Sequence, residues 1–63
     1  MEIIASYVLS NVASLNIIEI NDELVTFVDP IQKKHHVKIY TDTDRAYFKW
    51  NSMRIHLDEC MRV

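Results

Sequence analysis

The stretch from Val37 to Leu57 constrains the fold most strongly, because polar and apolar residues alternate through it around two short turns. Tyr40 can pair with Tyr47 around the first turn, and Phe48 can pair with Ile55 around the second. Side chains alternate between the two faces of a strand, so a slip of one residue would bury charge on every strand. The sequence therefore predicts two consecutive β-hairpins with a fixed register.

This register separates the side chains into two faces. The inward face is apolar and holds Val37, Ile39, Thr41, Ala46, Phe48, Trp50, Met53, Ile55 and Leu57. The outward face is charged and aromatic and holds His36, Lys38, Tyr40, Arg45, Tyr47, Lys49, Arg54, His56 and Asp58.

The composition excludes several classes of function but does not identify one. The 63 residues are enough for one small domain, residues 1–63, near the lower size limit for a self-supporting core. Glycine is absent, which excludes glycine-rich phosphate loops, dinucleotide fingerprints and nucleophile elbows. The single Cys60 leaves no internal disulfide and favours a reducing compartment. No segment is apolar enough to span a membrane and no signal peptide is evident, so we expect a cytoplasmic protein.

Charge is divided unevenly between the two halves of the chain. Residues 1–30 contain five acidic residues and no Lys or Arg, whereas residues 31–63 contain seven basic and four acidic residues. This asymmetry predicts electrostatic complementarity within the fold or with a partner.

Residues 2–14 form the most ambiguous segment. Ile4, Val8 and Val12 recur at helical spacing opposite a stripe of polar residues four apart. The β-branched content supports a strand instead, but strict alternation fails at Tyr7-Val8-Leu9. The pattern favours a helix.

Residues 15–29 predict a further hairpin around Asn21-Asp22, since Asn and Asp tolerate turn geometry. Pairing Ile18 with Val25 directs Ile18, Ile20, Val25 and Phe27 inward. The outward side then carries an apolar patch, defined as Leu15, Ile17, Leu24 and Val28. Soluble monomers rarely expose such a patch, so a wrong register, a closed barrel or a covering chain must account for it. We favour a covering protein partner, with a second copy of the chain as the expected one.

The predicted fold is therefore α+β: an N-terminal helix followed by a five-stranded antiparallel meander. A helix followed by five short strands is similar in outline to the Sm-like and other SH3-like barrels, so a small barrel is the alternative to an open sheet. No family is assigned, because no motif of those proteins can be matched.

The outward surface of the last strands is the second candidate site. We name it the basic–tyrosine face and define it as Lys38, Tyr40, Arg45, Tyr47, Lys49, Arg54 and His56. Aromatic rings flanked by cations on an open sheet are typical of proteins that bind single-stranded nucleic acid. A solvated sheet face with paired tyrosines is the plainer interpretation.

Metal binding and catalysis are poorly supported. The register puts His36 more than about 10 Å along the sheet from the row of His56, too far for one ion. Cys60 and His56 are the one nucleophile–base pair close in sequence, but on a strand they would lie about 13 Å apart. We expect no metal, no cofactor and no catalytic residue.

Two binding functions follow from these surfaces. The leading prediction is a non-enzymatic protein-binding module, a homodimeric adaptor or inhibitor of the kind encoded by phages and mobile elements. The alternative is binding of single-stranded RNA or DNA through the basic–tyrosine face.

Overall fold

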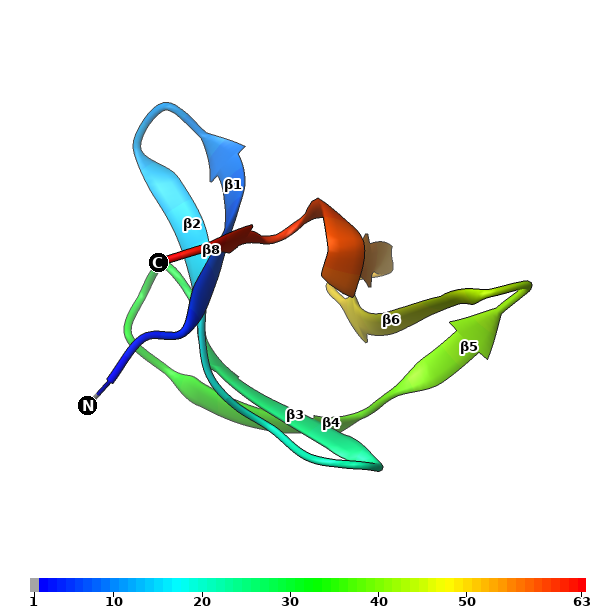
Figure 1. The fold of residues 1–63 in the computed structure, drawn as a ribbon. Coiled ribbons are helices and arrows are strands. Elements are labelled where there is room, and N and C mark those ends of the chain that lie inside the picture. Colours follow the sequence, from blue (N-terminus) through cyan, green and yellow to red (C-terminus); the bar gives the residue numbers. More distant parts are fainter. Residues whose placement is uncertain (1) are drawn as a thin grey trace.

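The protein is built almost entirely from antiparallel strands, as seen in a computed structural model that describes residues 2–63 (Figure 1). The elements are β1 (Ala5–Ser10), β2 (Ala13–Ile20), β3 (Leu24–Val28), β4 (Lys34–Lys38), β5 (Tyr40–Asp42), β6 (Arg45–Trp50), β7 (Met53–His56), the 3-10 turn η1 (Leu57–Glu59) and β8 (Met61–Arg62). They form a five-stranded sheet of order β4-β3-β2-β1-β8, here sheet A, and a three-stranded sheet of order β5-β6-β7, here sheet B.

The predicted N-terminal helix is wrong, and with it the α+β class. Residues 2–14 contribute β1 and the start of β2, which pair as an antiparallel hairpin. Val8 pairs with Ser14 but Ser10 pairs with Ala13, so Leu9 is an additional residue in β1. Such a β-bulge interrupts the two-residue period, which explains why alternation failed at this point in the sequence.

The predicted pairing of β2 with β3 is wrong, because β2 contains a second bulge. Ile17 pairs with Phe27 whereas Glu19 pairs with Thr26, so Ile18 is the additional residue in β2. Directly paired residues lie on the same face of an antiparallel sheet. Ile17 therefore lies on the inward face with Phe27, and both side chains have no exposed surface.

The predicted apolar patch is consequently not an exposed surface. Leu15 and Ile17 are 0% exposed and Val28 is 4% exposed, while Leu24 alone remains open at 42%. Of the three explanations for the patch, the wrong register accounts for Leu15 and Ile17. Val28 is buried because β3 is covered on both of its faces.

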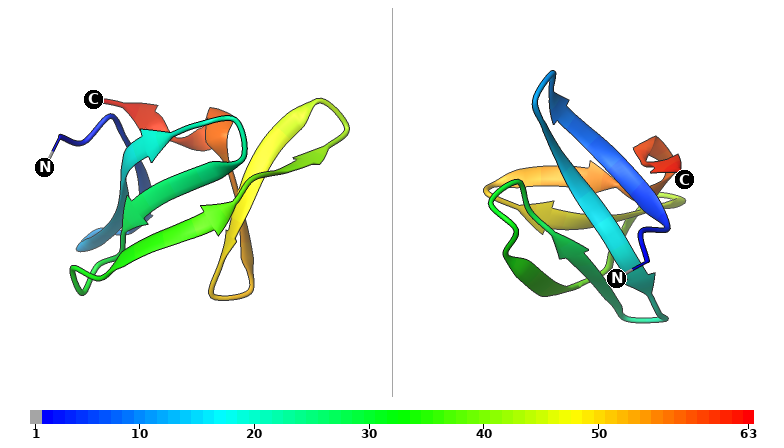
Figure 2. Two further views of the ribbon diagram at one scale, coloured as in Figure 1. Left: turned by 90° about the horizontal axis from the view of Figure 1, so that it is seen from below. Right: turned by 90° about the vertical axis from the view of Figure 1, so that its left-hand side faces the viewer.

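The chain passes from sheet A to sheet B through β4 and β5, which are separated only by Ile39. The backbone N–H of Ile39 donates to the carbonyl of Glu23 at 2.8 Å, which ties this junction to the end of β3. After β7, η1 redirects the chain so that β8 returns to pair with β1 in sheet A (Figure 2). Two linked antiparallel sheets therefore replace the predicted single meander or small barrel.

Sheet B follows the predicted register. Tyr40 pairs with Tyr47 and Phe48 pairs with Ile55, as the alternation predicts. Phe48 and Ile55 are fully buried, and the Phe48 ring lies 4.9 Å from that of Phe27 in sheet A. This aromatic contact joins the two sheets in a common core. Within residues 2–63, no helix has the length and apolar character needed to cross a membrane.

Candidate functional site

The basic–tyrosine face is built on one row of residues that crosses sheet B. Tyr40, Tyr47 and His56 are directly paired across β5, β6 and β7. The Tyr40 and Tyr47 rings stack with centroids 5.6 Å apart, and the Tyr47 and His56 rings lie 5.4 Å apart. The register thus gathers three rings from three strands into a continuous row.

Cationic side chains lie over the two tyrosine rings. The Nζ atoms of Lys49 and Lys38 are 5.3 and 5.8 Å from the centroid of Tyr40. The guanidinium of Arg54 is 5.4 Å from the centroid of Tyr47. At these distances the ammonium and guanidinium groups are attracted by the ring faces, each by about 0.5–1 kcal/mol where the pair is exposed.

The two arginines of the face are partly neutralised by carboxylates. Arg45 donates from Nε and Nη2 to the two oxygens of Asp58 at 2.9 and 2.8 Å. The hydrogen bond from Arg45 holds the pKa of Asp58 below its ordinary value, and the same bond raises the pKa of Arg45. Arg54 lies 3.6 Å from a carboxylate oxygen of Asp42.

The lysines differ from the arginines. In the described part of the chain, neither Lys38 nor Lys49 has a carboxylate within ion-pair distance. Lys38 pairs directly with Leu24 of β3, so the exposed Leu24 side chain adjoins the same surface. Within the basic–tyrosine face, the cations without a carboxylate partner therefore lie around Tyr40.

The two tyrosines are not equivalent. Tyr40 is 40% exposed, whereas Tyr47 is only 9% exposed beneath its neighbours. Sequence reasoning treated Tyr47 as a surface residue because it alternates with Phe48. Its burial follows from coverage by Tyr40, Arg54 and His56, which come from the two flanking strands. Tyr40 is therefore the more accessible of the two rings.

The tandem histidines have local partners. His35 donates from Nε2 to Asp29 at 2.8 Å and stacks on Phe27 at 5.0 Å, whereas His36 hydrogen-bonds with Thr26 at 3.0 Å. Across residues 2–63, no three His, Cys, Asp or Glu side chains are arranged to hold a metal ion.

Cys60 and His56 come closer than a strand would allow, because η1 intervenes, but the contacts of the described residues do not pair the thiol with the imidazole. The Cys60 thiol donates to the backbone carbonyl of His56 at 3.6 Å, and the His56 imidazole faces Glu59. Burial raises the pKa of the Cys60 thiol, and the charges of Glu59 and Asp58 raise it further. Each effect disfavours the nucleophilic thiolate.

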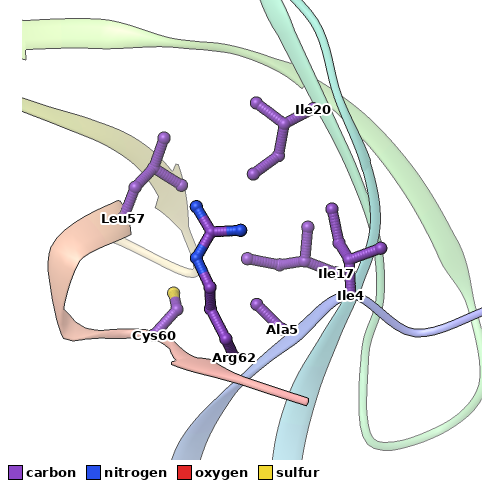
Figure 3. A pocket seen from close by; sticks show the side chains of 7 residues that line it. All are labelled: Ile4, Ala5, Ile17, Ile20, Leu57, Cys60 and Arg62. Carbon is purple, nitrogen blue, oxygen red and sulfur yellow. The ribbon is translucent and has the colours of Figure 1, made fainter.

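Sequence reasoning missed a cavity of about 220 Å³ between sheet A and η1 (Figure 3). We name it the Arg62 cavity; its lining residues are Ile4, Ala5, Ile17, Ile20, Leu57, Cys60 and Arg62. No signal in the sequence marks it, since β8 contains only two residues and its pairing with β1 depends on η1.

Comparison of the chain with protein-family models, with curated proteins and with solved structures finds no match.

Proposed function

We propose that this protein is a non-enzymatic binding module that holds single-stranded RNA or DNA on its basic–tyrosine face. One observation carries the proposal: the ammonium groups of Lys38 and Lys49 lie 5.8 and 5.3 Å from the ring centroid of Tyr40, which is 40% exposed. Neither lysine has a carboxylate partner among residues 2–63. A partly exposed aromatic ring with unpaired cations close to it suits a nucleobase and its flanking phosphates.

Stacking supplies the base contact. A base that stacks on an aromatic side chain contributes about 1–3 kcal/mol with little dependence on sequence, because every base has a π-face. Tyr40 can offer its ring in this way, with the adjacent Leu24 side chain as an apolar neighbour. Tyr47 supports Tyr40 from beneath and takes no direct part.

Contacts between lysines and phosphate groups supply the rest of the binding free energy. The chain carries a net charge of −2, so attraction depends on the local cations and not on the overall field. For single strands, the logarithm of the affinity falls with the logarithm of the salt concentration with a slope of about −0.7 per phosphate contact. Contacts from Lys38 and Lys49 therefore give an expected slope of about −1.4.

The apolar patch that supported the homodimer hypothesis is mostly buried within one chain. Leu15, Ile17 and Val28 lie in the interior of one chain, and Leu24 alone remains exposed. Stable interfaces bury about 1,200–2,000 Å² in total, far more than one leucine supplies. The exposed charged surface therefore supports nucleic-acid binding better than the former patch supports self-association.

Fluorescence anisotropy with a labelled oligonucleotide of mixed sequence, about 15 nucleotides long, tests the proposal. We expect measurable binding at about 50 mM salt that weakens toward 200 mM with the slope given above. Tyr40→Ala should weaken binding about 5- to 150-fold, and Lys49→Gln should reduce the salt slope by about 0.7.

Lys33→Gln is the matched control, because it removes the same charge from the loop between β3 and β4, outside the basic–tyrosine face. It should leave both affinity and slope unchanged within error. Equal losses of affinity from Lys33→Gln and Lys49→Gln would indicate non-specific electrostatic attraction and no defined binding site. Absence of binding at low salt would contradict the proposal outright.

A further inference from the structure

We propose that the Arg62 cavity is a docking site for a partner protein that inserts one aliphatic or aromatic side chain with a carboxylate beside it. The cavity lies between sheet A and η1, away from the row of rings on the basic–tyrosine face. It thus provides a second binding surface, independent of nucleic-acid binding.

The position of Arg62 is the unusual feature. Arg62 pairs directly with Ala5, a core residue that is 7% exposed, so the two side chains share one face of sheet A, although Arg62 itself is exposed on the edge strand β8. The small Ala5 side chain leaves room for it. Figure 3 shows the guanidinium directed into the space between Leu57 and the two isoleucines of β2.

The guanidinium has no anionic partner of its own. Among residues 2–63, no carboxylate lies within ion-pair distance of Arg62. The nearest acidic segment is η1, but Asp58 is bound to Arg45 and Glu59 is turned toward Arg45 and His56. A cation that faces apolar walls without a counterion is complementary to an incoming carboxylate, which a guanidinium binds in a bidentate manner.

The size of the cavity indicates a side chain and not a free small molecule. Sites for small molecules have volumes of about 300–1,000 Å³, whereas this cavity has about 220 Å³. Ile20, one of its walls, stays 41% exposed, so apolar surface continues beyond the cavity. A protein partner can fill the cavity with an anchor residue and cover this rim at the same time.

An NMR titration of the ¹⁵N-labelled protein with a blocked peptide, acetyl-Gly-Asp-Leu-Gly-amide, tests the inference. We expect saturable shifts confined to the amides of β1, η1 and β8 together with those of Ile4, Ile17 and Ile20. Replacing Asp by Asn or Leu by Ala in the peptide should weaken binding about fivefold or more. Arg62→Gln should weaken it to the same extent, whereas Arg62→Lys should retain part of the affinity because it keeps the charge.

Arg54→Gln is the control, because it removes one positive charge from another surface and should leave peptide binding intact. Shifts that Arg62→Gln does not reduce would overturn the assignment, as would the absence of shifts. Tighter binding of free hexanoate than of the peptide would identify a small carboxylic acid as the ligand and would contradict the proposal. Cavity signals that move on dilution of the protein alone would identify a second copy, with the same consequence.

Discussion

Strands β2 and β6 are both central strands, paired on two sides, yet only β6 keeps one alternation of faces along its length. In β6, the fully buried Phe48 lies between the exposed Lys49 and Tyr47, which is covered by its neighbours. In β2, Leu15 and Ile17 are buried but Ile20, not Glu19, lines the same side of the sheet. The bulge at Ile18 changes the parity in the middle of β2.

The difference shows that bulges, and not the length of the turns, decide whether the alternation of a strand can be read from the sequence. A two-residue loop joins each pair of strands in sheet B and also joins β1 to β2 in sheet A, but only the pairs of sheet B remain in register to the end. Sheet A has two bulged strands, and each bulge reverses which residues face the core. Alternation is a reliable guide only where no bulge intervenes.

The largest expected effect concerns the contact between the two sheets. Phe48→Ala should lower the free energy of unfolding by about 3–5 kcal/mol, because it leaves a cavity against Phe27. Lys49→Ala, one position along β6, should cost at most about 1 kcal/mol. Urea unfolding followed by tryptophan fluorescence measures both, and equal costs would contradict the assigned faces.

The next prediction concerns the bulge in β2. Ile17→Ala should cost about 2–5 kcal/mol, because Ile17 is fully buried. Ile18→Ala, at the half-buried bulge position, should cost less than about 2 kcal/mol. Urea unfolding of the two variants gives the order, and a larger loss from Ile18→Ala would show that the simple alternating register was correct.

Acid should weaken the hydrogen bonds that Asp29 accepts at the end of β3. Asp29 is buried and accepts hydrogen bonds from His35 and from the N–H groups of Ile31 and Lys33, and the bond from His35 contributes most to lowering its pKa. A lowered folded-state pKa stabilises the fold above the ordinary value of about 3.9 and loses this effect as the pH falls through the folded-state pKa. Asp29→Asn should therefore reduce stability at neutral pH and flatten its dependence on acid.

Asp58 of η1, which accepts hydrogen bonds from Arg45 of sheet B, is the exposed counterpart of Asp29. The pKa of Asp58 is also lowered, through Arg45, but its side chain is 58% exposed against 7% for Asp29. Solvent and salt screen exposed pairs. Asp58→Asn should thus cost less than Asp29→Asn, and its cost should diminish at high salt. Thermal unfolding across the acid range measures both, and the reverse order would contradict the account.

The smallest effect concerns the turn between β6 and β7. Asn51 and Ser52 have φ values of 53° and 68°, the left-handed geometry of a type I′ turn, which favours Asn-Gly. Ser52→Gly should raise the free energy of unfolding by about 0.5 kcal/mol. Ser14→Gly, inside β2, should lower it by about 0.5–1 kcal/mol, and a stability loss from Ser52→Gly would argue against this turn geometry.

The sequence was sufficient for sheet B and for its outward surface. The predicted pairs Tyr40–Tyr47 and Phe48–Ile55 are present, and most residues named for the basic–tyrosine face lie there. The sequence could not show that Arg45 is held by Asp58, because η1 turns the chain after His56. It also could not show that Tyr47 is covered by its neighbours.

Sheet A was less accessible to sequence reasoning. Of the residues with helical spacing, Ile4 precedes β1, Val8 lies in β1 and Val12 lies in the turn before β2. A short hairpin with a bulge at Leu9 thus resembles a helical pattern over so few residues. The Arg62 cavity depends on the pairing of Ala5 with Arg62 near opposite ends of the chain. No local pattern encodes a contact of that range.

An NMR titration of the ¹⁵N-labelled protein with an oligothymidylate of about 10 nucleotides tests the central claim most directly. We expect saturable shifts at Lys38, Tyr40 and Lys49, reversed by added salt, with the amides around the Arg62 cavity unmoved. Shifts spread evenly over the surface, shifts confined to sheet A, or an unchanged spectrum would contradict the assignment of the basic–tyrosine face as a nucleic-acid site.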